Sequence, residues 1–299
     1  MDKFRREYGG RSLVTICGAF IIVLTVSIGL FLFFKGSGTF TKYHHSVFEF
    51  LFSSDFNPMD APGQYGGTVG AAVPIVGSLL TCGLALLIAT PFSIAAAVFI
   101  TEIAPVAGKK VFQPAIEIFV GIPSVVYGWI GLSLLVPWIK NAFHLKAGFS
   151  VLGAGIVLAI MIFPTITTLS ADAIRSVPMD YRKAAYGLGS TRWQMIWHVV
   201  LPASLSGILT GIIMGLSRAF GEALAVAMVI GKTRAFPKNI FSPTINLTAA
   251  IAADMTGSTD GGEFNLALWS MALLLFIISI LFIVLIHVID AKSKKKLAG

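Results

Sequence analysis

Six stretches of mostly hydrophobic residues, separated by polar segments, dominate the pattern of this 299-residue chain. A helix needs about 20 mostly apolar residues to cross the hydrocarbon core of a bilayer, and each stretch is long enough. The pattern therefore predicts an all-α, polytopic membrane protein with six transmembrane helices. The predicted spans cover residues 12–34, 73–100, 112–138, 149–171, 205–230 and 266–289.

The composition excludes the water-soluble classes of protein. Hydrophobic residues make up 56% of the chain and charged residues only 12%, whereas a soluble domain carries roughly 25% charged residues. The longest polar segments, residues 35–72, 172–204 and 231–265, are each too short to form a core of their own. We therefore expect a single transmembrane domain, residues 1–299, with no soluble catalytic domain.

The positions of the basic residues predict the orientation. With the N-terminus inside, fourteen of the 22 lysines and arginines lie on cytoplasmic segments and seven on outside loops, while Arg218 lies within a span. Cytoplasmic loops of membrane proteins carry an excess of Lys and Arg, so this distribution predicts that both termini are cytoplasmic. The net charge of +8 is thus explained by membrane topology, and no nucleic-acid partner is expected.

Arg218 and Glu222 are predicted to lie near the middle of the fifth span. Each charge at that depth costs roughly 2.5–3.5 kcal/mol on insertion scales, so the pair needs a reason to be there. Four residues apart on a helix, the two side chains would be neighbours able to form an ion pair. One interpretation is that the pair only fixes helix packing. The other is a substrate pathway, because a guanidinium matches two oxygens of a phosphate-like anion.

Weaker pathway candidates lie in the third and fourth spans. The sequence Gly-Ile-Pro-Ser ending at Ser124 interrupts the third span, and Pro164-Thr165 forms a similar polar kink in the fourth. Non-helical backbone at membrane depth is tolerated where it lines a cavity or is buried in protein, although a plain proline kink explains each site equally well. Glu117 is either a second buried charge or an interfacial one.

Neither a metal site nor a bound cofactor is predicted. His44 and His45 have no further ligand spaced nearby, so they are expected to be solvated loop residues. The segment Gly231-Lys232-Thr233 looks like the end of a phosphate-binding loop, but Val226 stands where that motif requires glycine. ATP binding through that motif is therefore excluded.

The polar segment between the fourth and fifth spans, residues 172–204, has the most specific pattern. It predicts a short helix, a glycine break and a second amphipathic helix, which composition alone would explain as a membrane-surface helix pair. Its spacing, however, resembles the E-A-A-x3-G-x9-I-x-L-P loop of ABC importer permeases. Ala184, Ala185 and Gly189 fall on the Ala, Ala and Gly positions, and Lys183 stands where that family has Glu. The resemblance implies that this loop docks into a separate ATPase subunit.

Further stretches are similar to the phosphate-uptake (Pst) permeases, and to the PstC type more than to the PstA type. They are residues 72–79, 99–105, 121–128 and 218–226. This resemblance implies a type I permease core in a prokaryotic cytoplasmic membrane. It also implies a second, PstA-like permease subunit, PstB-like ATPase subunits and an external PstS-like phosphate-binding protein. The alternatives are the PstA-type partner itself or a permease for another oxyanion, such as sulfate or molybdate.

Overall fold

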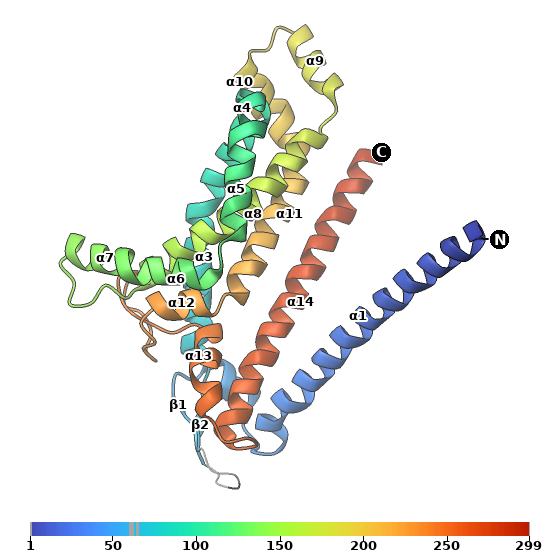
Figure 1. Cartoon of the computed structure of the whole chain (residues 1–299). Helices are drawn as coiled ribbons and strands as arrows, with labels where there is room; N and C mark the ends of the chain where they lie inside the picture. Colours follow the sequence, from blue (N-terminus) through green and yellow to red (C-terminus); the bar gives the residue numbers. More distant parts are fainter. Residues whose placement is uncertain (1, 60–62, 64–65, 299) are drawn as a thin grey trace.

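The computed structural model describes residues 2–59, 63 and 66–298 of the chain (Figure 1). Five helical segments are long and apolar enough to cross a membrane, and a bent pair of helices makes a sixth crossing if its two halves count as one span. These five begin at residues 11, 72, 151, 192 and 263 and end at residues 41, 103, 176, 221 and 289. Four of these segments lie within several residues of the predicted spans. The exception is the segment 192–221, which begins and ends well before the predicted span 205–230.

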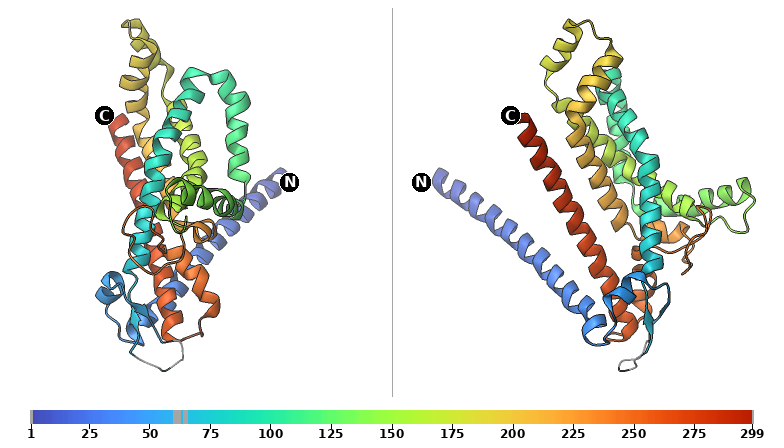
Figure 2. Two further views of the ribbon diagram at one scale, coloured as in Figure 1. Left: turned by 90° about the vertical axis from the view of Figure 1, so that its left-hand side faces the viewer. Right: turned by 180° about the vertical axis from the view of Figure 1, so that it is seen from behind.

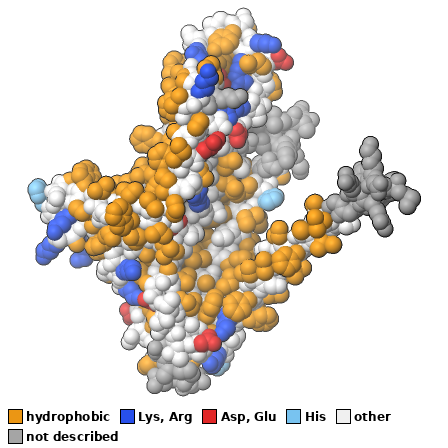
Figure 3. Space-filling model, viewed as in Figure 1, with side chains coloured by type: hydrophobic (Ala, Val, Ile, Leu, Met, Phe, Trp, Pro, Cys, Tyr) orange, Lys and Arg blue, Asp and Glu red, His pale blue; other side chains and the backbone are white. Residues whose placement is uncertain are grey.

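The five segments are built mainly from long α-helices with short π-helical stretches at their ends. The long helices are α1 (Asp2–Thr41), α3 (Ala72–Val98), α8 (Val151–Ser176), α11 (Leu201–Gly221) and α14 (Glu263–Ala298). The π-helix η1 (Phe99–Ile103) extends α3, while α10 (Arg192–Met195) and η4 (Ile196–Val200) precede α11. Hydrophobic side chains cover most of the flanks, whereas many charged side chains gather near the two ends (Figure 3).

The third predicted span is bent by 92° rather than continuous. Its first half is α4 (Pro105–Ala107), η2 (Gly108–Phe112) and α5 (Gln113–Gly121), and its second half is α6 (Ser124–Ile130), η3 (Gly131–Leu135) and α7 (Val136–Ala142). The break follows from Pro123, which lacks an N–H and drives Ile122 into an extended conformation with ψ of 126°. Tyr127 donates a hydrogen bond of 2.7 Å to the carbonyl of Phe119, which satisfies one of the free acceptors at the end of α5.

The fifth predicted span, residues 205–230, is wrong as a single helix. Helix α11 ends at Gly221, and Glu222 is extended, with φ of −77° and ψ of 119°. A separate short helix, α12 (Leu224–Val229), follows. The hydroxyl of Thr248 donates a hydrogen bond of 2.7 Å to the Glu222 carbonyl, so a distant segment stabilises the break.

Helices α3, α8 and α11 form the centre of the fold (Figure 1). Glycines permit the close approach of α11 to α8, because a Cβ atom at Gly207 would lie 2.5 Å from Ala173 Cβ and one at Gly215 would lie 2.6 Å from Ile166 Cγ1. Helix α1 contacts α14 near Gly36 and Leu273. The two helices then diverge toward the N-terminus (Figure 2), and much of α1 exposes large hydrophobic side chains.

Short elements cover the end of the molecule opposite the tip formed by α9 (Met179–Gly187) (Figure 1). They are α2 (Val47–Phe52), the antiparallel pair β1 (Phe56–Asn57) and β2 (Thr68–Val69), α13 (Leu247–Asp254) and the 3₁₀ turn η5 (Met255–Gly257). Apolar residues of this region, including Phe50, Val69 and Leu268, pack into a buried cluster of their own.

The interpretation of His45 as a solvated loop residue is wrong. Its Nε2 lies 2.7 Å from Glu263 Oε1, and its Nδ1 lies 3.2 Å from Glu49 Oε2. Glu263 is itself buried and accepts a hydrogen bond of 2.6 Å from the Met59 amide. The imidazole therefore joins α2 to the start of α14. Among the residues that the structure describes, no cluster of ligands suits a metal ion.

This arrangement predicts a pH-dependent stability. Burial lowers the pKa of His45, but the hydrogen bonds and charges of Glu263 and Glu49 outweigh burial, and the pKa is raised above its usual 6.5. A raised pKa gives stabilisation that is complete below pH 6.5 and lost as the pH rises through the folded-state pKa. We expect wild type to exceed His45→Gln in thermal midpoint near pH 5.5, with the difference shrinking toward about pH 8.5. A difference independent of pH would contradict this assignment.

Candidate functional site

Arg218 and Thr165 are brought together by the packing of α11 against α8. Arg218 Nη1 donates a hydrogen bond of 3.1 Å to Thr165 Oγ1. The guanidinium remains exposed on the surface of this single chain, so most of its donors are available to a ligand. Two residues that the sequence singled out from different spans are thus in contact where α11 packs against α8.

The predicted ion pair between Arg218 and Glu222 does not form within the described part of the chain. The prediction assumed a continuous helix, in which residues four apart share a face, but α11 ends between them. Glu222 instead turns toward the next helix, where its Oε1 accepts a hydrogen bond of 3.2 Å from the Ala225 amide. A carboxylate is favourable there because the first N–H groups of a helix lack partners.

The two short helices that follow the breaks, α6 and α12, pack against each other. A Cβ atom at Gly128 would lie 2.7 Å from Ala225 Cα and 2.9 Å from Met228 Sδ, so only glycine permits this approach. Ser124 is the first residue of α6 and is half-buried. Tyr127 of the same helix lies within electrostatic range of Arg218. The two breaks therefore flank the exposed guanidinium.

A polar face runs from Arg218 along α8 and α5. On α8 it contains Thr165, Thr168, Asp172 and Arg175, which are spaced at helical intervals, and on α5 it contains Gln113 and Glu117. Gln113 joins the two helices: it donates to Glu117 Oε1 at 3.3 Å and accepts from Arg175 Nη2 at 3.5 Å. We call these residues together with Arg218 the polar face.

A cavity of about 100 Å³ lies within the polar face and is lined by Glu117, Asp172 and Thr167, among others. Thr167 Oγ1 is buried and has no hydrogen-bond partner in the described part of the chain. Exposed charges facing hydrocarbon would cost several kcal/mol, so a polar face on spanning helices must face water or another protein chain. In this single chain the Glu117 side chain is an exposed member of this face.

The loop after α8 forms a short helix, α9, that ends at a glycine turn. Gly189 follows α9 with φ of +81°, a conformation that side chains with a Cβ rarely adopt. The Ser190 amide donates to the Ala185 carbonyl at 3.1 Å, and the Gly189 amide donates to the Tyr186 carbonyl at 2.9 Å, which is the Schellman pattern. Ala185 is buried, whereas Lys183 and Ala184 are exposed and available to a docking partner.

The Schellman motif predicts the effect of changing its glycine. Because a residue with a Cβ in the left-handed region costs roughly 1–2 kcal/mol, Gly189→Ala should speed hydrogen exchange of the amides at the end of α9 by roughly ten-fold. Gly187→Ala is the matched control, since Gly187 has open space around it and no positive φ. Equal exchange rates in the two variants would contradict this account.

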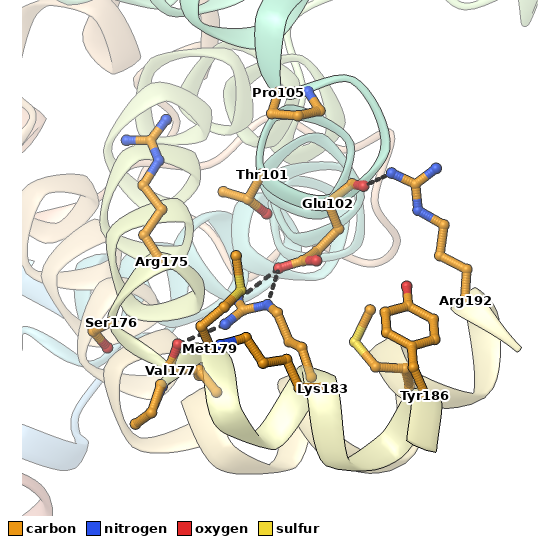
Figure 4. Close-up of a pocket in the computed structure, with 13 residues that line it drawn as sticks. Thr101, Glu102, Pro105, Arg175, Ser176, Val177, Met179, Lys183, Tyr186 and Arg192 are labelled. Carbon is orange, nitrogen blue, oxygen red and sulfur yellow. Dashed lines mark hydrogen bonds and ion pairs between the residues drawn. The ribbon is translucent and has the colours of Figure 1, made fainter. Parts of the chain in front are cut away.

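Sequence reasoning missed a contact beneath this loop. Arg182 of α9 forms an ion pair of 2.7 Å with Glu102 of η1, and Glu102 is labelled in Figure 4. A cavity of about 920 Å³ lies beside the pair and is lined by basic side chains that include Lys183 and Arg192. The two partners are 80 residues apart, and neither belongs to a pattern that could have paired them.

Comparisons with known proteins agree with this architecture. The family of inner membrane components of binding-protein-dependent transport systems matches residues 89–295. A probable ABC transporter permease, YqgH, of Bacillus subtilis is 46% identical over 96% of this chain and 92% of its own length. The phosphate transport system permease protein PstC of Pasteurella multocida is 34% identical over 93% of this chain and 89% of its own length.

Two solved structures share the fold at low sequence identity. A chain of a bacterial alginate ABC transporter has a TM-score of 0.62 and 17% identity, with 98% of this chain and 96% of that chain covered. A chain of the MetNI methionine ABC transporter in an inward-facing conformation has a TM-score of 0.51 and 16% identity. The match covers 72% of this chain and 91% of that chain. These chains and the family match indicate a type I permease core. The protein belongs to the inner membrane permease family of the binding-protein-dependent ABC importers.

Proposed function

We propose that this chain is the PstC-type permease subunit of an ATP-driven importer of inorganic phosphate. The observation that carries this proposal is the exposed Arg218 guanidinium, which donates to Thr165 at the end of the polar face that lies farther from α9. Support for the substrate also comes from PstC relatives, such as that of Pasteurella multocida at 34% identity and that of Xylella fastidiosa at 32%.

The chemistry of the polar face suits a tetrahedral oxyanion. A guanidinium presents a planar fork of N–H donors that matches two oxygens of one phosphate group. The Thr165 hydroxyl, which accepts from Arg218, has a proton left to donate to the same ligand. Glu222 follows the end of α11, four residues after Arg218. Its carboxylate could accept a proton from a protonated phosphate oxygen, whereas sulfate has no proton to donate near pH 7.

The membrane subunits of this family catalyse no reaction, and ATP hydrolysis takes place on a separate ATPase that works with them and with a substrate-binding protein. For this chain we propose a PstA-like second permease, PstB-like ATPases and a PstS-like external binding protein. The polar face would then line the pathway against the second permease. Both termini and α9 would be cytoplasmic, where Lys183, Ala184, Ala185 and Gly189 meet the ATPase, and the membrane would be the cytoplasmic membrane of a prokaryote.

The competing assignment is another oxyanion, because sulfate and molybdate also fit a guanidinium fork. The test is ATP hydrolysis by the four-component complex in proteoliposomes, stimulated by binding protein loaded with phosphate, sulfate or molybdate. We expect stimulation by phosphate alone. Stimulation by sulfate or molybdate instead would transfer the assignment to that anion, and the Glu222→Gln variant would show whether this carboxylate contributes to the selection.

A further inference from the structure

Glu102 and Arg182 form a nearly buried ion pair between the end of the second span and the loop helix α9. The guanidinium donates to Glu102 Oε1 from Nε at 3.2 Å and from Nη2 at 2.7 Å. The side chain of Arg182 is 12% exposed and that of Glu102 is 9% exposed. Solvent therefore screens this contact far less than it screens an ordinary surface pair.

The same guanidinium also contacts the end of the fourth span. Arg182 Nη1 donates to the Val177 carbonyl at 2.5 Å, and Nη2 donates to the Ile174 carbonyl at 2.9 Å. These carbonyls lie at the C-terminus of α8, where the last acceptors of a helix lack partners and a cation is favourable. One side chain therefore joins three elements: η1, the end of α8 and α9.

Arg192 approaches Glu102 from the other side of the loop (Figure 4). Its Nη2 donates to the Glu102 carbonyl and, at 3.1 Å, to the Ile103 carbonyl. Glu102 is thus held through its side chain by one end of the loop and through its backbone by the other. We call this set, Glu102, Arg182 and Arg192, the loop clamp.

The energetics of the loop clamp favour a positional role over a stabilising one. A buried ion pair often stabilises a fold no better than well-packed apolar side chains would, but it specifies one arrangement of its partners. Apolar contacts already hold the loop, because Ala185 packs with Ile174 and Met195 in a buried cluster. The clamp is therefore an additional and directional connection between α9 and two spans.

We propose that the loop clamp transmits movement of α9 to the ends of the second and fourth spans, with Arg182 and Glu102 as positioning residues for coupling. The proposal rests on the family's separate ATPase, which moves α9, and on the proposed function for the transported ion. When α9 moves, a contact shared by both spans carries η1 and α8 with it. Networks of hydrogen bonds and ion pairs between two sites can carry coupling of this kind. Lys183 differs from Arg182, since it is 74% exposed and lies 3.6 Å from the exposed Asp180.

The test measures the number of ATP molecules hydrolysed for each ion transported by the assembled complex in proteoliposomes. We expect Glu102→Gln and Arg182→Gln each to leave the ATPase subunit bound and to raise this ratio about five-fold or more. Because the two residues act as one unit, the double variant should be no worse than either single variant. Arg182→Lys, which keeps the charge but not the fork, should give an intermediate ratio.

Asp180→Asn is the matched control, because Asp180 is on the same helix but 90% exposed, and its ratio should equal that of wild type. An unchanged ratio in both single variants, or additive effects in the double variant, would overturn the proposal. Loss of the ATPase subunit from every clamp variant would also overturn it, since the contact would then serve docking. If wild type moves another oxyanion, the proposed substrate is wrong, and the same ratio measured with that ion still tests the clamp.

Discussion

Arg218→Gln is expected to reduce phosphate uptake by roughly 30-fold or more at equal amounts of protein in the membrane. A hydrogen bond to a charged group contributes about 1.5–3 kcal/mol, and the guanidinium can make two to one phosphate, so losing both corresponds to at least this factor. The Arg218 side chain is exposed in this chain, so the fold should survive the change. The measurement is the initial rate of labelled phosphate uptake in cells that depend on this chain.

Arg218→Lys separates charge from geometry. Lysine keeps the positive charge but provides a point donor instead of a planar fork, so uptake should be intermediate and KM should rise. Thr165→Val should have a smaller effect than Arg218→Gln, because it removes one neutral partner of the guanidinium. Uptake in Arg218→Gln within about two-fold of wild type would reduce this residue to a role in packing.

Gly128→Ala is expected to destabilise the protein by about 1–3 kcal/mol and to lower transport, because its Cβ would overlap the backbone of α12. The clash is with Ala225 Cα at 2.7 Å, which cannot rotate away as a flexible side chain could. Separating α6 from α12 would also move both helix breaks beside Arg218. Thermal unfolding of the purified protein, followed by circular dichroism, measures the effect.

Gly83→Ala is the matched control for this substitution. Gly83 is also in a spanning helix, α3, but a Cβ atom there would have open space around it. Replacing a helical glycine without a clash stabilises by about 0.4–1 kcal/mol, so the two variants should shift the midpoint in opposite directions. Equal shifts would contradict the close packing of α6 on α12.

Hydrophobicity predicted the spans because a bilayer requires long apolar helices, and it could do so without tertiary information. The bend in the third span had a local signal in Pro123, which the sequence identified as an interruption. The break at Glu222 had none as strong, since no proline is present. It depends on contacts with distant residues, namely the Thr248 hydroxyl and the start of α12.

The sequence singled out the residues of the candidate site one by one, but it did not predict which of them contact each other. Arg218 and Thr165 were both identified because polar groups are costly in spans, yet their contact depends on how α11 crosses α8. The predicted ion pair between Arg218 and Glu222 is wrong, because side chains four residues apart are neighbours only within one continuous helix. The contact of Glu102 with Arg182 joins residues 80 positions apart, so only the folded structure reveals it.

The most direct test of the central claim is uptake of labelled phosphate at low external concentration, in cells whose only high-affinity system depends on this chain. The account predicts rapid uptake that excess sulfate or molybdate does not inhibit and that is lost in Arg218→Gln. Inhibition by sulfate or molybdate, or the absence of phosphate uptake in wild type, would contradict it.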